Sequence, residues 1–572
     1  MAAETTEKYD FIIVGAGPSG ATLASHLASS LPSLRILLLE AGESGVDNAP
    51  LYDRYTALMT PGLNYGYQTV PQESLNGSIV NYSRGKFHCV GLGGTSLINF
   101  GLWTRGPRDD YDRWARLVGN ADFGWENIRK VFNDIETFSD PGYTDERSNY
   151  VSFEKDAHGQ SGPVNVELPR RWESHILALM KGVEEHGFQM NKDLSSGNPI
   201  GVGLCPATSR EGVRVTAKTA YLSSVPDNLR VKTGVQVARV LFEEGKAVGV
   251  KSVNGTKFFA QKEVILSAGA LDSPKLLLLS GVGPAADLAS LNIPVVQDLQ
   301  YVGKNLQDHC HFPVTVVVRD STREPNKLRP GSDVLAAARA EFAQGGTGPL
   351  AYVNGSYILG FLKDESLYSS EEFQSLDQQT REHLKKPTIP SWEFCTGLPL
   401  LGPPPPGPPR QFLSSVAVLM NPQSRGIVKL QSTDPRQPAL FDPRLMTDPY
   451  DQKVLVAAAE LVLSFLKTPS IAATIEAPAK MPASDSKEDI LDFIKANLKS
   501  TWHMSGTCKM GLGEHDEAVV DPQFRVRGIE GLRVVDLSVS PFLVNAHPVA
   551  CAYAVGKIAA ETIRMQHGPK EV

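Results

Sequence analysis

The amino-acid sequence predicts an α/β protein of mixed α+β type, and three patterns carry this prediction. A short β-branched run at residues 9–14 enters a glycine-rich turn, and an Ala/Leu-rich helical stretch follows to about Ser30. A second apolar run covers residues 34–39. Two more buried-strand patterns, at 264–270 and 532–536, lie far along the chain. Short apolar runs that alternate with helical patterns are typical of a parallel sheet with crossover helices.

Length, composition and charge limit the classes of protein that the chain can form. It has 572 residues, of which 41% are hydrophobic and 21% charged, so it can bury a large core, and we expect two lobes. The net charge of −7 and the lack of a dense basic tract argue against a nucleic-acid partner. The longest apolar run near a terminus, 11–14, is far shorter than the roughly 20 residues of a membrane span, so we expect none.

Cysteine spacing and the first residues predict a cytoplasmic or otherwise intracellular protein. The six cysteines lie far apart without a CxxC pair, as reduced thiols in large intracellular proteins do, and the polar start does not resemble a secretory leader. Four N-x-S/T sequons, at Asn76, Asn81, Asn254 and Asn354, keep a secreted protein with a trimmed leader as the alternative.

The first chemical motif is the GxGxxG turn between the first strand and helix. Gly15 can adopt the turn dihedrals, Gly17 lets a pyrophosphate approach the backbone, and Gly20 lets the helix lie close to the strand. Glu40 ends the second strand, where a carboxylate can bind both hydroxyls of an adenosine ribose. The turn and second strand therefore predict an ADP-binding site, formed by Gly15, Gly17, Pro18, Ser19, Gly20, Glu40 and Ala41.

Distant segments favour FAD over NAD as the dinucleotide. The 264–270 run enters a turn of small residues that suits a close pass beside the ligand at Ala268, and the 532–536 run ends in Asp536, which can hold a ribityl chain. A capped strand end is an equally good explanation of Asp536. Three passes of the chain beside the ligand imply a long ligand. They favour FAD, because an NAD site is usually completed within one continuous unit of chain.

Several long motifs resemble the glucose–methanol–choline (GMC) oxidoreductases, in particular the branch of glucose oxidase and aryl-alcohol oxidase. They are 91–99 (GLGGTSLIN) with 103–106, 269–274 with 280–284, 302–309, 422–426, and two C-terminal segments, 501–507 and 540–548. The resemblance implies a flavoprotein that oxidises an alcohol. It also implies that the 91–99 turn lies beside the reactive edge of the flavin. Some relatives attach FAD through a histidine at the position of Ile98, so we expect non-covalent FAD here, with His88 and Cys89 as a minor reservation. The cofactor contacts implied by the resemblance are Gly91, Gly94, Thr95, Asn99, Gly101, Val237, Ala268, Asp536, Ala546, His547 and Pro548.

The resemblance also implies a discontinuous arrangement of two domains. Residues 1–165, 205–311 and 500–572 would form a Rossmann-like FAD-binding domain. Residues 166–204 and 312–499 would form a substrate-binding domain on a mostly antiparallel sheet with helices.

Two histidines match the catalytic positions of the family. Alcohol oxidation by a flavin needs a base for the hydroxyl proton, and histidine suits this role because its pKa lies near neutrality. By the resemblance His503 is the base, although Met504 replaces the usual proline, and His547 hydrogen-bonds the substrate oxygen; the two roles could be exchanged. Pro548 fits the first position of a helix, with His547 as its cap. That helix would stabilise negative charge on the reduced flavin.

Other features leave alternatives open. The pattern His309-Cys310-His311 makes a poor ligand set, so no metal is predicted, and the remaining histidines are interpreted as surface or packing residues. The proline run at 403–409 is either a rigid loop over the active-site entrance, which we favour, or a ligand for a proline-recognition domain.

The predicted activity is oxidation of a primary alcohol, with aromatic alcohols and specialised metabolites as candidate substrates, and with oxygen or a quinone or dye as the electron acceptor. Non-redox lyase or cyclase chemistry on retained FAD is the second hypothesis. A light-driven decarboxylase is the third.

Overall fold

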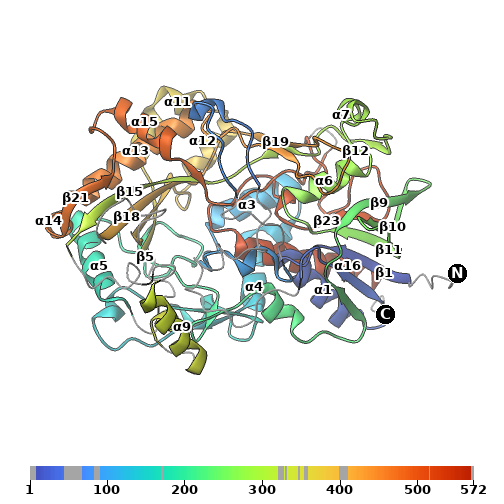
Figure 1. Ribbon diagram of the computed structural model, residues 1–572, viewed down its shortest axis with the longest axis horizontal. Helices are drawn as coiled ribbons and strands as arrows, with labels where there is room; N and C mark the ends of the chain where they lie inside the picture. Colours follow the sequence, from blue (N-terminus) through green and yellow to red (C-terminus); the bar gives the residue numbers. More distant parts are fainter. Residues whose placement is uncertain are drawn as a thin grey trace.

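The computed structural model describes residues 8–43, 67–82, 91–168, 172–319, 328, 332–345, 348–352, 358–398, 410–513 and 516–568. Two large sheets lie at opposite ends of the molecule (Figure 1). Each sheet has its own buried apolar core, and the segments between the two sheets carry the candidate site.

The first sheet has seven strands in the order β8-β2-β1-β11-β10-β9, and β23 also pairs with β11. The strands β8, β2, β1, β11 and β23 are parallel neighbours, whereas β9 and β10 extend the sheet in antiparallel fashion. Their bounds are β1 Lys8–Val14, β2 Ile36–Leu39, β8 Leu229–Lys232, β9 Val237–Glu243, β10 Lys246–Ser252, β11 Lys257–Leu266 and β23 Leu532–Val534. Strands buried on both faces explain the near-continuous apolar runs of the sequence.

Helices α1 (Pro18–Ser30) and α16 (Val549–His567) pack together beside β1 (Figure 1). Their contact is close, because a Cβ added at Gly556 would lie 2.4 Å from the carbonyl oxygen of Ser19. The Ser19 hydroxyl donates to the carbonyl of Ala552 at 2.7 Å. The first and last helices of the described chain thus support the glycine-rich turn together.

The second sheet is antiparallel throughout, in the order β16-β17-β18-β15-β21, with β22 also paired to β15. Its strands are β15 Cys310–Val318, β16 Ile358–Leu362, β17 Trp392–Leu398, β18 Gln411–Leu419, β21 Ile475–Lys480 and β22 Lys499–Ser500. Helix α13 (Pro449–Leu466) contacts β17 and β18, and α5 (Ser174–His186) contacts β17.

The remaining elements connect and flank the two sheets. The remaining α-helices of the described residues are α3 Arg108–Val118, α4 Trp125–Ile135, α6 Asp272–Leu279, α7 Ala285–Ser290, α9 Asp333–Gly345, α10 Pro349–Tyr352, α11 Glu371–Gln374, α12 Gln378–Leu384, α14 Pro469–Ala472 and α15 Lys487–Asn497. The short strands are β3 Glu136–Ser139, β4 Val164–Glu167, β5 Gly201–Leu204, β6 Ser209–Arg210, β7 Val213–Arg214, β12 Val282–Gly283, β13 Gln297–Asp298, β14 Lys304–Leu306, β19 Gly426–Lys429 and β20 Leu440–Asp442.

The predicted fold class is confirmed, with small differences at element ends. The helix expected to begin at Pro548 begins at Val549, and Pro548 rather than His547 caps it. The strand expected at 264–270 spans 257–266, because the chain turns at Ser267 to pass the glycine-rich turn. The domain boundaries stay a prediction. Within the described ranges, none of the helices is both long and apolar enough to cross a bilayer.

The proline run itself lies outside the described residues, but the strands on either side of it are described. They are β17 and β18, which pair directly, as in Cys395 opposite Val416. The run therefore connects two adjacent antiparallel strands. Both interpretations of the run stay predictions.

Candidate functional site

A continuous cavity of about 360 Å³ runs from the glycine-rich turn to the two C-terminal histidines. Its wall includes segments near residues 15–19, 94–102, 235–237, 267–276, 501–504 and 536–552, which lie far apart in the chain. A long, narrow cavity assembled in this way has the shape that an extended dinucleotide requires.

The glycine-rich turn at one side of the cavity has the geometry that its motif requires. Gly15 has a φ of +103°, and a Cβ added there would lie 2.3 Å from the carbonyl oxygen of Ser267. At Gly17 an added Cβ would meet only Gly94 Cα, at 3.9 Å, so this side of the turn is open. Gly17 caps helix α1 and lines the cavity. The open turn and the helix N-terminus together form a cradle that fits a pyrophosphate.

Glu40 lies in the cavity wall at the end of β2. Its Oε2 accepts from the backbone N–H of Ala16 at 2.9 Å, and its Oε1 accepts from that of Gly42 at 2.9 Å. Burial raises the pKa of Glu40 to about 7, against the effect of these backbone hydrogen bonds. Each carboxylate oxygen keeps further acceptor capacity, so the residue fits the two hydroxyls of a ribose.

Asp536 lines the cavity but already holds three protein donors. Its Oδ2 accepts from the N–H of Gly269 at 2.9 Å and from the hydroxyl of Ser273 at 2.5 Å. Its Oδ1 accepts from the N–H of Ser538 at 2.8 Å, which caps a short 3₁₀ turn. The capped strand end anticipated as one explanation is therefore present. A contact of this carboxylate with a ribityl chain stays a prediction.

The cavity wall also includes His503 and His547, whose ring centroids lie 5.0 Å apart with the rings nearly perpendicular. Burial lowers the pKa of His503 well below its usual value, and the nearby His547 and His309 act in the same direction. The two predicted catalytic residues are thus brought together at the site where the sequence placed them.

A third histidine, His309, lies behind His503 and is fully buried. The Nδ1 atoms of His309 and His503 are 2.9 Å apart, and the Nε2 of His309 lies 2.9 Å from the carbonyl oxygen of Met420. Burial lowers the pKa of His309 to about 3. The sequence considered His309 only as part of a metal pattern that was not predicted, and the structure adds its polar contact with His503.

The chain holds these histidines together by joining residues 307–310 to 499–505. Asp308 Oδ1 accepts from the N–H of His503 at 2.8 Å, and its Oδ2 accepts from the hydroxyl of Ser500 at 2.5 Å. The same hydroxyl accepts from the N–H of Trp502 at 2.7 Å, although Trp502 has a left-handed φ of +61°. A non-glycine residue there costs about 1–3 kcal/mol, which the surrounding contacts offset. The strained turn aims His503 at the cavity.

His547 is fixed by two contacts on opposite sides. Its backbone N–H donates to the Thr104 hydroxyl at 2.8 Å, and its Nε2 lies 3.1 Å from Glu393 Oε2. Glu393 belongs to β17 of the second sheet and is 2% exposed. A carboxylate can only accept, so the Nε2 of His547 carries a hydrogen. A residue of the second sheet, Glu393, thereby determines that the hydrogen of the His547 ring lies on Nε2.

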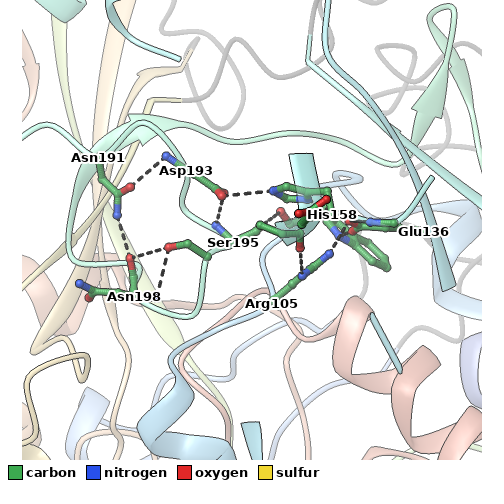
Figure 2. Close-up of polar contacts among 12 residues, drawn as sticks. Arg105, Glu136, His158, Asn191, Asp193, Ser195 and Asn198 are labelled. Atoms are coloured by element: carbon green, nitrogen blue, oxygen red, sulfur yellow. Dashed lines mark hydrogen bonds and ion pairs between the residues drawn. The ribbon is translucent and has the colours of Figure 1, made fainter. Parts of the chain in front are cut away.

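A buried charge cluster supports the segment that carries Thr104. Figure 2 shows Glu136 between Arg105 and His158, with Asp193 on the far side of the histidine ring. Glu136 also accepts from the indole N–H of Trp103 at 2.7 Å. Both ring nitrogens of His158 face carboxylates, at 2.8 and 3.2 Å, so the ring is held as an imidazolium. Arg105 and Trp103 flank Thr104, so this cluster fixes the backbone beside His547.

The apolar wall near the histidines is formed by side chains of two segments. Phe100 and Trp502 face each other with ring centroids 6.4 Å apart, and Leu102 and Met504 complete the wall. This end of the cavity therefore combines two histidine side chains with an apolar wall.

Most residues predicted to bind the cofactor meet at this one cavity. Those in its wall are Gly15, Gly17, Pro18, Ser19, Glu40, Ala41, Gly94, Thr95, Asn99, Gly101, Val237, Ala268, Asp536, His547 and Pro548. Gly20, Gly91 and Ala546 lie outside the wall. His88 and Cys89 are outside the described residues. Contact of each residue with FAD stays a prediction.

Sequence reasoning missed Glu393 and His309. The available signal for Glu393 was its position between Trp392 and Phe394 in a mostly apolar strand. A carboxylate that is buried in such a strand needs a hydrogen-bond partner. For His309 the available signal was its place in the 302–309 motif that the family resemblance already included.

The fold and the cavity fit an α/β protein that binds an extended dinucleotide. A sequence model described as GMC oxidoreductase matches residues 9–311, and a second with the same description matches residues 422–556. The chain belongs to the GMC oxidoreductase family, and it is an FAD-dependent alcohol oxidoreductase.

Individual relatives agree over nearly the full length. The alcohol dehydrogenase [acceptor] of Pseudomonas putida is 32% identical over 566 residues, 97% of this chain and 95% of its own. An FAD-dependent oxidoreductase from Chaetomium thermophilum has a TM-score of 0.84 at 26% identity, covering 98% of this chain and 99% of its own. A fungal aryl-alcohol oxidase has a TM-score of 0.82 at 27% identity, with coverage of 98% and 99%.

Proposed function

We propose that this enzyme oxidises a primary alcohol to an aldehyde, with His503 as the base that accepts the hydroxyl proton at Nε2. The contact between His503 and His309 is the observation that carries this proposal, because it determines which nitrogen of His503 is free. His547 would hydrogen-bond the substrate oxygen beside it. When bound, FAD supplies the acceptor for the hydride that leaves the alcohol carbon.

The protonation of the histidine pair follows from its acceptors. The Met420 carbonyl can only accept, so the Nε2 of His309 carries a hydrogen. With a pKa of about 3 the His309 ring is neutral at physiological pH, so its Nδ1 has a lone pair and accepts. The 2.9 Å contact then requires that His503 donates from Nδ1. Neutral His503 keeps its lone pair at Nε2.

His547 differs from His503 in its charge environment. Glu393 accepts from the Nε2 of His547, so the hydrogen on this nitrogen is already engaged with the protein. The arrangement favours His503, whose Nε2 lone pair is not engaged by His309, as the proton acceptor over His547, whose Nε2 is held by Glu393. The contacts of His309 and Glu393 support this division of roles over the exchanged one.

The apolar wall supports an apolar, and particularly an aromatic, alcohol as substrate. Phe100 and Trp502 offer ring surface, and Leu102 and Met504 offer no hydrogen bonds for the several hydroxyls of a sugar. The structural relative described as an aryl-alcohol oxidase agrees with this proposal. We also propose non-covalent FAD, because Ile98 in the cavity wall has no nucleophilic atom.

Anaerobic mixing of the enzyme with a panel of aryl, allylic, aliphatic and sugar alcohols tests the proposal. Bleaching of the flavin by aryl or allylic primary alcohols, and aldehyde formed in equal amount, is the expected result. Reoxidation by oxygen, compared with a quinone or dye, then identifies the acceptor.

The control for this experiment is a matched ketone without alcohol, because its carbonyl carbon bears no hydrogen that could leave as hydride. A flavin that stays oxidised with every alcohol while substrate is consumed would contradict oxidation and support lyase or cyclase chemistry. Turnover only under blue light would support the decarboxylase hypothesis instead.

A further inference from the structure

The inference concerns Asn99 and the buried side chain behind it, Arg214. Asn99 lines the cavity at the histidine end, immediately after the 3₁₀ turn Gly94–Leu97. Arg214 is 3% exposed and comes from strand β7. Its Nη1 donates to the carbonyl oxygens of Asn99, at 2.7 Å, and of Ser96, at 3.3 Å. One guanidinium thus binds the C-terminal half of the turn and the residue two positions beyond it.

The same Nη1 determines the orientation of the Asn99 amide. It lies 2.9 Å from the side-chain Oδ1 of Asn99, and the backbone N–H of Gly101 lies 3.0 Å from that oxygen. Both neighbours can only donate, so the atom facing them must be the oxygen rather than the nitrogen of the amide. The Asn99 NH₂ group is therefore directed away from Arg214 and Gly101, and the residue presents a hydrogen-bond donor to the cavity.

We propose that Arg214 is a positioning residue that fixes Asn99 as a hydrogen-bond donor to the flavin ring and thereby raises the affinity of FAD for electrons. The ring must lie at this end of the cavity, because His503 and His547 line the same region. Acceptor atoms of the flavin gain negative charge on reduction, so a donor directed at them stabilises the reduced form more than the oxidised form. The positive charge of Arg214 behind the amide acts in the same direction.

The proposal rests on FAD binding in this cavity and is independent of the substrate. A midpoint potential measured by dye equilibration requires no alcohol. The variants can have an unchanged midpoint potential although the enzyme oxidises alcohols. They can also have a changed midpoint potential although no alcohol is oxidised. Failure of the proposal and failure of the proposed function are thus distinguishable.

Asn99→Asp is the decisive variant. It keeps an oxygen acceptor for Arg214 and Gly101 but replaces the donor with a negatively charged acceptor. Loss of a hydrogen bond to a charged group shifts an equilibrium about ten- to hundredfold, which for a two-electron couple lowers the midpoint potential by about 30–60 mV. Arg214→Lys keeps the charge but not the forked geometry, so it should lower the potential by a smaller amount.

Arg425→Lys is the matched control. Its Nη1 likewise donates to two backbone carbonyls, those of Pro422 and Ser424, and Arg425 does not line the cavity. The midpoint potential of Arg425→Lys should equal that of the wild type. All proteins are measured with FAD in excess, so weakened retention does not obscure the potential. A wild-type potential in Asn99→Asp would overturn the proposal. If that variant does not fold, a wild-type potential in Arg214→Lys would overturn it equally.

Discussion

Replacing His309 tests the link between the buried histidine and the base most directly. His309→Phe keeps a planar ring but removes the acceptor for the Nδ1–H of His503. Leaving a buried donor without a partner costs about 1–3 kcal/mol. At about 1.4 kcal/mol per tenfold, the active tautomer of His503 should become about 5- to 150-fold less populated.

The assay is anaerobic stopped-flow reduction of the flavin at saturating alcohol. We expect the reduction rate of His309→Phe to fall by that factor while FAD stays bound. His309→Asn is the matched variant, because its Oδ1 can accept close to the position of the lost Nδ1, and it should recover part of the rate. A wild-type rate in His309→Phe, or equal losses in both variants, would refute the tautomer argument.

Four further outcomes follow from the structure. Glu40→Gln should release FAD more readily without changing the spectrum of the bound flavin, as dialysis and absorbance would measure; a changed spectrum with normal retention would assign Glu40 another role. Acid or heat should release all flavin into the supernatant, because Ile98 offers no linkage, and flavin in the pellet would contradict this. Reduction of the wild type should not slow as the pH falls through about 6.5, because the pKa of His503 is lowered well below its usual value and the base stays neutral; an acid limb near that pH would contradict it. Burial opposes the charged form of His158, but Asp193 and Glu136 outweigh it and raise its pKa. The stability that this ring contributes is therefore complete below the pKa of the unfolded chain and is lost as the pH rises through the higher folded pKa. Thermal melts should show the deficit of His158→Gln to be largest in acid and to shrink toward alkaline pH, and a constant deficit would contradict the charged ring.

The parts of the fold that the sequence predicted are those encoded locally. The run from β1 through Gly15 and Gly20 to α1 is contiguous, and its dihedral and packing requirements can be read from a few neighbouring residues. His503 and His547 were found through long motifs of a known family. Each of these signals is a single continuous stretch of the chain.

The parts that the sequence did not predict depend on contacts between distant segments. Glu393 reaches His547 from strand β17, across 154 positions, and His309 reaches His503 across 194. Nothing in the residues around either partner specifies such a pairing. The orientation of the Asn99 amide likewise depends on Arg214, which lies 115 positions away.

Asp536 illustrates a third kind of limit. Its position at a strand end was predicted correctly, but two explanations, a ribityl contact and a cap, fitted that position equally well. The carboxylate accepts from Gly269, Ser273 and Ser538, and this set of donors is decided by how the end of β23 meets the turn after β11, the start of α6 and a 3₁₀ turn. A pattern within one strand contains no information about those donors.

The role of His503 is the central claim, and anaerobic flavin reduction in His503→Ala tests it. A positioned base contributes about 10²–10⁴-fold, so the reduction rate at saturating alcohol should fall by that factor. Reduction by dithionite should be unchanged, because it needs no base. Reduction by alcohol at the wild-type rate in His503→Ala, with FAD fully bound, would contradict the account.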